Sequence, residues 1–111
     1  MRKILVYDDK NYIYRLIKFN IESEEIQVTR IKKNYFPNVS LSSFDYIFFV
    51  YYNEFNIIDF IDYFEVNKNI IVLYENHLFL EVFSNTKTVF PTINLNLHKR
   101  EIILLINEII S

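Results

Sequence analysis

The chain contains no cysteine, no glycine and no alanine. Without cysteine it has no disulfide, no thiolate nucleophile and no cysteine zinc site. The absence of glycine excludes the normal phosphate loops of the Rossmann and Walker types, in which glycine lets the backbone approach a phosphate group closely. Turn positions with left-handed backbone angles must therefore fall mainly to asparagine, which tolerates them best among the remaining residues.

A basic surplus and long apolar runs are also missing. The net charge is -2, which disfavours a general nucleic-acid binder. No apolar run approaches the roughly 18 residues of a membrane-spanning helix, and only a short run follows Met1-Arg2-Lys3, unlike a signal peptide. At 111 residues, 51% of them hydrophobic, the chain suffices for one core. We expect a single cytoplasmic domain over 1–111, without an output domain and without nucleic-acid or membrane partners.

The chain is rich in residues with AT-rich codons, as in an AT-rich genome: isoleucine, asparagine, lysine, phenylalanine and tyrosine. The apolar residues form short runs typical of buried parallel strands. The predicted strands are residues 3–7, 26–31, 45–51, 70–74 and 88–93. The most apolar of them, 45–51, belongs in the middle of a sheet. Residues 26–31 alternate between apolar and polar for most of their length, which indicates a half-exposed strand. Residues 88–93 contain Pro91, which removes one hydrogen-bond donor from the strand ladder. Both strands therefore belong at sheet edges.

Apolar residues at helical spacing predict helices over 11–21, 55–65 and 99–110, with shorter ones over 39–44 and 78–83. The expected caps are Asp9 or Asn11 for the first helix, Ser40 for 39–44 and Asn96 for the last helix. The expected inward residues of 55–65 are Ile57, Ile58, Ile61 and Phe64. Strands and helices that alternate in this way predict a parallel sheet with right-handed crossovers.

The stretch Ile4-Leu5-Val6-Tyr7-Asp8-Asp9 carries a family resemblance. Its two acids follow the first strand at the edge where open α/β sheets place their ligand sites. With the element order and the length, it resembles the receiver domains of response regulators. The resemblance implies an α/β fold with a single doubly wound five-stranded parallel sheet of order 2-1-3-4-5, a flavodoxin-like three-layer sandwich. That order puts 26–31 and 88–93 at the edges, as their own sequences require.

A working receiver, by the same resemblance, holds Mg²⁺ with the two acids and phosphorylates an aspartate that ends strand three. Asp8 and Asp9 match the acidic pair. Val50, or Tyr51 after a slip of one position, stands where the phospho-acceptor aspartate belongs. Tyr74 replaces the usual hydroxyl residue after strand four, and no lysine follows strand five before position 99. We interpret the chain as a degenerate, or pseudo-, receiver that is not an enzyme and needs no cofactor.

Two interpretations of the acids remain open. Asp8 and Asp9 hold a divalent cation, weakly because no third carboxylate joins them, or they are vestigial, with Asp9 capping the first helix and Asp8 acting as a polar anchor. Tyr51, Tyr52 and Tyr74 fall at the carboxyl ends of adjacent strands. They fill the former acidic pocket, form an aromatic recognition surface, or simply complete the core with their phenol tips in water.

The histidines and the last elements suggest surface roles. His77 and His98 fall in separate loops without metal-ligand spacing, which favours surface or capping residues. Lys99-Arg100 opens a helix, where positive charge opposes the dipole, so the pair is an anion or partner contact or a solvated face. In receivers the last three elements form the dimer and partner surface. The residues expected to bind a partner there are Phe79, Phe83, Phe90, Leu104 and Leu105.

The function expected from these features is that of a non-enzymatic receiver-like module for signalling or protein–protein interaction. Its partner would be another signalling protein or a second copy of the chain. The alternatives are a small inhibitor or immunity-type binding protein, or a weakly Mg²⁺-dependent phosphate-binding domain that uses Asp8 and Asp9. A flavin site is disfavoured because the first loop is acidic, whereas flavodoxins cradle phosphate with hydroxyl groups.

Overall fold

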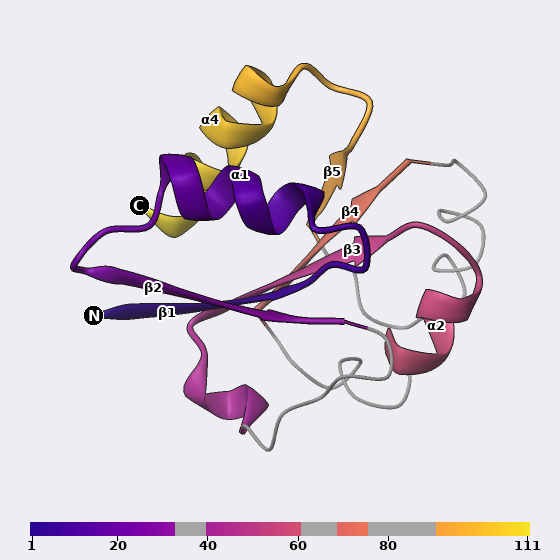
Figure 1. Ribbon diagram of the computed structural model, residues 1–111, viewed down its shortest axis with the longest axis horizontal. Coiled ribbons are helices and arrows are strands. Elements are labelled where there is room, and N and C mark those ends of the chain that lie inside the picture. The colour runs from indigo at the N-terminus through magenta and orange to yellow at the C-terminus, as the bar shows by residue number, and fades with distance from the viewer. Residues whose placement is uncertain (33–39, 61–68, 76–90) are drawn as a thin grey trace.

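The computed structural model describes residues 1–32, 40–60, 69–75 and 91–111, apart from the side chain of residue 57. Its centre is a five-stranded parallel sheet of order β2-β1-β3-β4-β5 (Figure 1). The strands are β1 (Arg2–Tyr7), β2 (Ile26–Ile31), β3 (Tyr46–Tyr51), β4 (Ile70–Tyr74) and β5 (Thr92–Asn94). This confirms the predicted fold class, an α/β doubly wound sheet of order 2-1-3-4-5.

The predicted edge strands are at the edges. Within the described ranges β2 pairs with β1 alone among the strands, and buried and partly exposed residues mix along it, as its alternating sequence predicts. Pro91 comes directly before β5, and its carbonyl accepts the N–H of Val72 at 2.9 Å. Proline is tolerated here because it stands at the start of an edge strand. Residues 88–90 of the predicted last strand lie outside the described part of the chain, and β5 continues to Asn94.

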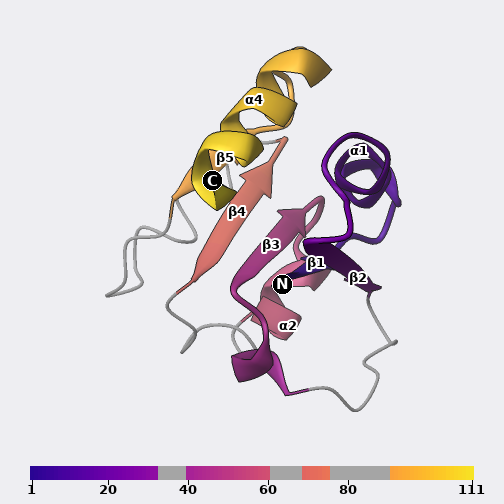
Figure 2. The ribbon, with the colours of Figure 1, turned by 90° about the vertical axis from the view of Figure 1, so that its left-hand side faces the viewer.

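Helices cover both faces of the sheet. Helices α1 (Tyr12–Asn20) and α4 (Lys99–Ile110) lie on one face, and α2 (Phe55–Asp59) lies on the other (Figure 2). The helix predicted over 39–44 is only a 3-10 turn, η1 (Leu41–Ser43), and Ser40 before it makes no side-chain cap. The predicted helix over 78–83 and the end of 55–65 lie outside the described residues.

The core on the α1/α4 face follows the predicted apolar stripes. α4 buries Ile102, Ile106 and Ile110, which recur every four residues, and α1 buries Ile13 and Ile17 in the same way. Each fully buried aliphatic side chain stabilises the fold by about 1.5–3 kcal/mol. In the described ranges, no helix has the length and apolarity needed to cross a membrane.

Helix α2 is rotated relative to the prediction. Ile58 was expected to point inward but is 58% exposed, so that prediction is wrong. Among the described side chains, Asn56 in α2 and Phe60 directly after it are fully buried, and the ring of Phe60 meets the ring of Phe49 edge-on at 5.1 Å between centroids. Hydrogen bonds made by Asn56, described below, orient the helix more strongly than the apolarity of Ile58. Ile61 and Phe64 lie outside the described residues.

The caps also differ from the prediction. Asn11 precedes α1 with φ 64°, the left-handed position that a chain without glycine leaves to asparagine, but its side chain makes no cap. The carboxylate that accepts the N–H of Tyr14 in the first turn belongs to Asp8, not Asp9. At α4 the cap is His98, whose Nδ1 accepts the N–H of Arg100 at 3.2 Å. Asn96, the predicted cap, instead donates to a backbone carbonyl in the loop after β4.

Candidate functional site

The candidate site lies at the carboxyl edge of the central strands. Asp8 and Asp9 follow β1, Tyr52 follows β3, and Asn56 comes from the start of α2. Parallel neighbouring strands end at the same edge, which brings these side chains together although about 44 residues separate them in the chain.

Asp8 is fully buried and hydrogen-bonded on both carboxylate oxygens. Its Oδ1 accepts the hydroxyl of Tyr52 at 2.5 Å and the backbone N–H of Lys10 at 3.2 Å. Its Oδ2 accepts the N–H of Tyr14 at 3.0 Å. A buried carboxylate needs such donors to offset its lost hydration. Asp8 therefore joins β1, the first turn of α1 and the loop after β3, as the polar-anchor interpretation describes.

Tyr52 fills the space beside Asp8. Burial, the hydrogen bond to Asp8 and the negative charge of Asp8 raise the pKa of the Tyr52 phenol far above its usual value of 10.0. The ammonium group of Lys10 lies 4.7 Å from the centroid of the Tyr52 ring, within the range of a cation–π interaction. The phenol is thus protonated at neutral pH and donates to the carboxylate.

Asn56 is the centre of a second hydrogen-bond network. It is fully buried, and its Nδ2 donates to Asp9 Oδ2 at 2.8 Å and to the hydroxyl of Tyr7 at 3.2 Å. Its Oδ1 accepts the backbone N–H groups of Tyr52 at 2.9 Å and Asn53 at 3.2 Å. The amide uses both its donors and its acceptor, which fixes the start of α2 against β1 and β3.

Tyr7 links this network to the core beneath it. Its hydroxyl donates to Asp59 Oδ2 at 2.5 Å, and its ring stacks on Phe49 with 4.5 Å between centroids and 9° between planes. Burial is the main cause that raises the pKa of Tyr7 far above 10.0, followed by the hydrogen bond to Asp59, while the bond from Asn56 acts in the opposite direction. Tyr7 is therefore a neutral donor inside the sheet, not an acid or base at neutral pH.

Arg30 holds the backbone of the acidic loop. Its Nε donates to the carbonyl of Asp8 at 2.9 Å, and its Nη2 donates to the carbonyl of Asp9 at 3.2 Å. The guanidinium thus lies behind the two acids, on the side of the edge strand β2. Its charge offsets part of the negative potential at the carboxyl edge.

The two acids differ from an open Mg²⁺ site in the hydrogen bonds that they make within the protein. This ion prefers octahedral coordination by oxygen and uses one or two carboxylates that face solvent or substrate. Asp8 is buried and engages three donors, and Asp9 turns toward Asn56. In the described part of the chain no three acidic or histidine side chains gather in a way that could hold a metal. A cation at Asp8 Oδ1 would compete with the Tyr52 hydroxyl for that oxygen.

The remaining predicted pocket residues separate onto the two faces of the sheet. Val50 is fully buried on the α1/α4 face, and Tyr51 is 7% exposed on the α2 face. Tyr51 and Tyr74 are direct neighbours in the register of β3 and β4, and both pack on the α2 side. Tyr52 packs on the opposite side, because successive residues of a strand alternate between faces. The predicted cluster of three tyrosines is therefore a pair and a single residue.

The predicted partner-binding residues are described only in part. Leu104 is 62% exposed and Leu105 is 36% exposed, on the side of α4 that faces away from the core. Phe79, Phe83 and Phe90 lie outside the described residues, and so does His77.

Four residues of the network were missed from the sequence: Tyr7, Arg30, Asn56 and Asp59. Asn56 carried a usable signal, because it lies four residues before Phe60 and so shares its helix face. Arg30 and Tyr7 carried none, since each sits within a strand pattern that describes only burial.

Comparison with known proteins found no matching family model, no matching curated protein and no matching solved structure. The α/β fold and the geometry of the carboxyl edge are therefore the basis for any functional proposal.

Proposed function

We propose that this chain is a non-enzymatic, receiver-like protein-interaction module, a pseudo-receiver that takes no phosphoryl group at the carboxyl edge of its sheet. One observation carries the proposal: the Asp8 carboxylate, which would hold Mg²⁺ in a receiver, is buried and bonded to the hydroxyl of Tyr52. A second observation supports the proposal. The last two residues of β3 are Val50 and Tyr51, so no carboxylate stands at the position of the phospho-acceptor.

Phosphoryl transfer of this type depends on positioning and on charge neutralisation by the metal ion. Freeing Asp8 for a cation would break a charge-assisted hydrogen bond, at a cost of about 1.5–3 kcal/mol. The nucleophile would still be missing, because neither the Val50 side chain nor a Tyr51 phenol with a raised pKa replaces an ionised carboxylate. The arrangement suits a rigid domain that presents its surface to another protein.

The exposed apolar side chains of α4 agree with this role. Leu104 and Leu105 lie one turn from Glu101 and Glu108 and interrupt an otherwise polar surface. The partner is another protein, either a signalling protein or a second copy of the chain.

The proposal is tested by amide NMR spectra of the full chain, recorded first with millimolar Mg²⁺ and then with beryllofluoride added. We expect no shift at Asp8, Asp9 or Tyr52 in either step, and no stable phosphorylated species by mass spectrometry after incubation with acetyl phosphate. Asp8→Asn is the control for any Mg²⁺ effect. Shifts that saturate with Mg²⁺, grow with beryllofluoride and disappear in Asp8→Asn would show a working phosphorylation site and overturn the proposal.

A further inference from the structure

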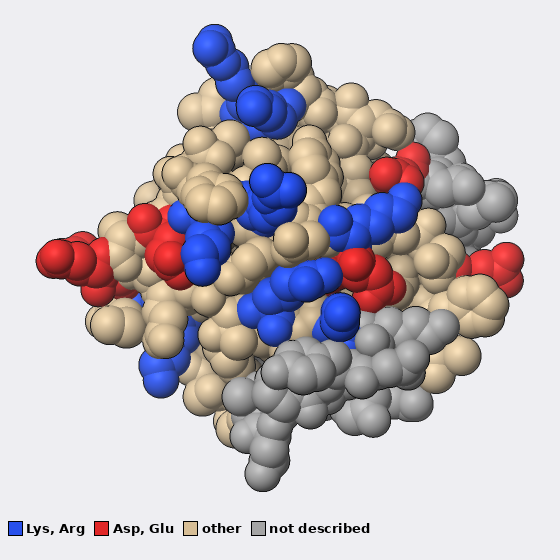
Figure 3. Space-filling model, viewed as in Figure 1, with Lys and Arg blue, Asp and Glu red and all other residues tan. Residues whose placement is uncertain are grey.

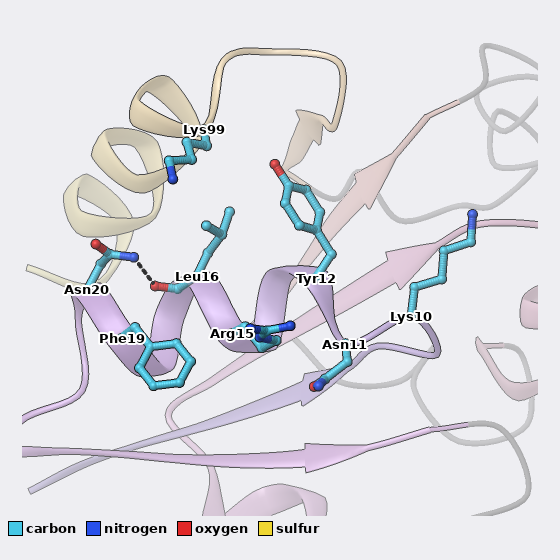
Figure 4. Close-up of a pocket in the computed structure, with 8 residues that line it drawn as sticks. All are labelled: Lys10, Asn11, Tyr12, Arg15, Leu16, Phe19, Asn20 and Lys99. Atoms are coloured by element: carbon cyan, nitrogen blue, oxygen red, sulfur yellow. Dashed lines mark hydrogen bonds between the residues drawn. The ribbon is translucent and has the colours of Figure 1, made fainter.

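A hollow of about 440 Å³ lies between α1 and the start of α4. Figure 4 shows Tyr12, Leu16 and Asn20 along one row of α1, with the Lys99 side chain of α4 extending toward them. Leu16 is almost fully buried and forms the floor, while Tyr12 is 40% exposed at the wall. The volume falls in the range of ordinary ligand sites, about 300–1,000 Å³. We call this hollow the α1–α4 cleft.

The α1–α4 cleft is positively charged. Of the residues that the structure describes, Lys10, Arg15 and Lys99 line it, and no aspartate or glutamate does. None of the three cations has a carboxylate partner among the residues that the structure describes. A second hollow on the other side of α1 is lined by Arg30 and Lys32, and its described lining contains no carboxylate. Figure 3 shows several lysine and arginine side chains over the middle of this face, with one group of carboxylate side chains among them. The chain as a whole has net charge -2, so the gathering is local.

The position of Lys99 is unfavourable for the stability of α4. It occupies the first position of α4, followed by Arg100, and the N-terminus of a helix carries partial positive charge from its unpaired N–H groups. An anion held beside Lys99 would remove this repulsion. This observation is independent of the hollow, and it agrees that the cleft takes a negatively charged group.

Apolar and aromatic surface accompanies the charge. Phe19 is 73% exposed and lies at the rim, one turn after Arg15 on α1. An occupant that bears both carboxylates and apolar side chains would meet the cations and cover Phe19 and Leu16 at the same time. Apolar surface of this kind with adjacent charge is typical of protein–protein interfaces.

The limits of the cleft favour a short protein segment over a nucleic-acid strand. From Tyr12 to Asn20 the cleft follows about 12 Å of α1, the length of roughly four residues of extended chain. Beyond Asn20 the turn between α1 and β2 carries Glu22, Glu24 and Glu25, all exposed. Figure 3 shows carboxylates at this margin, where they would repel a longer phosphate backbone.

We propose that the α1–α4 cleft docks an acidic segment of a partner protein, in which carboxylates contact Lys10, Arg15 and Lys99 and an apolar side chain covers Leu16 and Phe19. The proposal rests on the interaction role proposed above and names the chemistry of its partner. It places the contact on a different surface from the one predicted around Leu104 and Leu105.

The probe is a capped hexapeptide of alternating glutamate and leucine, titrated into the labelled full chain and followed by amide NMR. We expect saturable shifts centred on Tyr12, Arg15 and Lys99. In Arg15→Glu/Lys99→Glu the dissociation constant should rise at least about tenfold, because two attractions become repulsions. The control Arg2→Glu/Lys3→Glu changes the net charge equally at exposed positions on β1 and should leave binding within about twofold.

The charge-reversed variant is expected to fold, because a glutamate at position 99 is favourable for the helix dipole. A peptide with glutamine in place of glutamate should not bind. Absence of binding by the acidic peptide, or equal binding by Arg15→Glu/Lys99→Glu, would refute the acidic-segment site. Tighter binding of hexathymidylate at the same residues would refute it in favour of nucleic acid. These results are independent of how the protein responds to Mg²⁺ and beryllofluoride. The acidic-segment site and the pseudo-receiver proposal can therefore be refuted separately.

Discussion

The hydroxyl of Tyr52 donates to the carboxylate of Asp8 across 2.5 Å, and 44 residues separate the two in the chain. The bond closes the carboxyl edge of β1 against the loop after β3. The Asp8 carboxylate that accepts it is fully buried. The predictions below test this anchor, the network beside it and the helix that it positions.

Removing the Tyr52 hydroxyl should destabilise the fold. Tyr52→Phe leaves the buried Asp8 carboxylate with only its two backbone donors, so the free energy of unfolding should fall by about 1–3 kcal/mol. Urea denaturation followed by circular dichroism measures this change. Tyr14→Phe is the control, because the Tyr14 hydroxyl makes only an exposed contact with Lys18 at 3.3 Å. It should change stability by less than about 0.5 kcal/mol. Equal effects of the two substitutions would contradict an anchoring role for Tyr52.

The two adjacent acids should differ in their contribution to stability. Asp8→Asn turns an amide N–H₂ toward groups that themselves donate, and it should lower the free energy of unfolding by about 2–4 kcal/mol. Asp9→Asn keeps an oxygen that can accept from Asn56, so its cost should stay below about 1 kcal/mol. Thermal or urea unfolding of the two isosteric variants measures the contrast. A larger loss of stability in Asp9→Asn than in Asp8→Asn would contradict the anchoring role of the buried Asp8 carboxylate.

Stability should decline as the solution becomes alkaline. The pKa values of Tyr7 and Tyr52 are raised in the folded state above 10.0. Below pH 10 both phenols are protonated in the folded and unfolded states, and their full contribution is present. As pH rises further, the unfolded chain loses these protons and the folded chain keeps them. The free energy of unfolding should therefore fall by about 1.4 kcal/mol per pH unit for each tyrosine.

The alkaline decline is measured by urea unfolding between about pH 9 and pH 11, with tyrosinate absorbance as a second signal. The double variant Tyr7→Phe/Tyr52→Phe should be less stable at neutral pH but should lose stability less steeply. Tyr12→Phe, at a 40% exposed position, is the matched control and should leave the slope unchanged. If all nine tyrosines ionise near pH 10 without unfolding, the two phenols are not buried donors.

Helix α2 offers a direct test of which residues face the sheet. Phe60→Ala should cost about 3–5 kcal/mol, because it leaves a cavity against Phe49 in the core of the α2 face. Ile58→Ala, two residues earlier and 58% exposed, should cost less than about 1 kcal/mol. Urea unfolding of both variants with unchanged m-values gives the comparison. The reverse order would restore the orientation expected from the apolar pattern alone.

The architecture could be predicted from the sequence because its signals are local. Short apolar runs separated by helical patterns indicate a parallel sheet, and the alternation of 26–31 and the proline at 91 exclude those strands from its centre. The apolar spacing of α4 gave its buried face correctly through Ile102 and Ile106, since one continuous stripe dominates that helix.

Tertiary structure alone decided the polar network. Examples are the donor to Asp8, the inward face of α2 and the cap of α4. Each depends on contacts that the apolar periodicity of the sequence does not specify. A buried carboxylate or amide must find partners wherever the fold brings them. That requirement turned Asn56 inward and Ile58 outward, and it placed Tyr52 over Asp8. Apolar patterns in a sequence indicate which side chains are buried. Hydrogen bonds depend on distances of about 3 Å, which exist only once the strands have assembled.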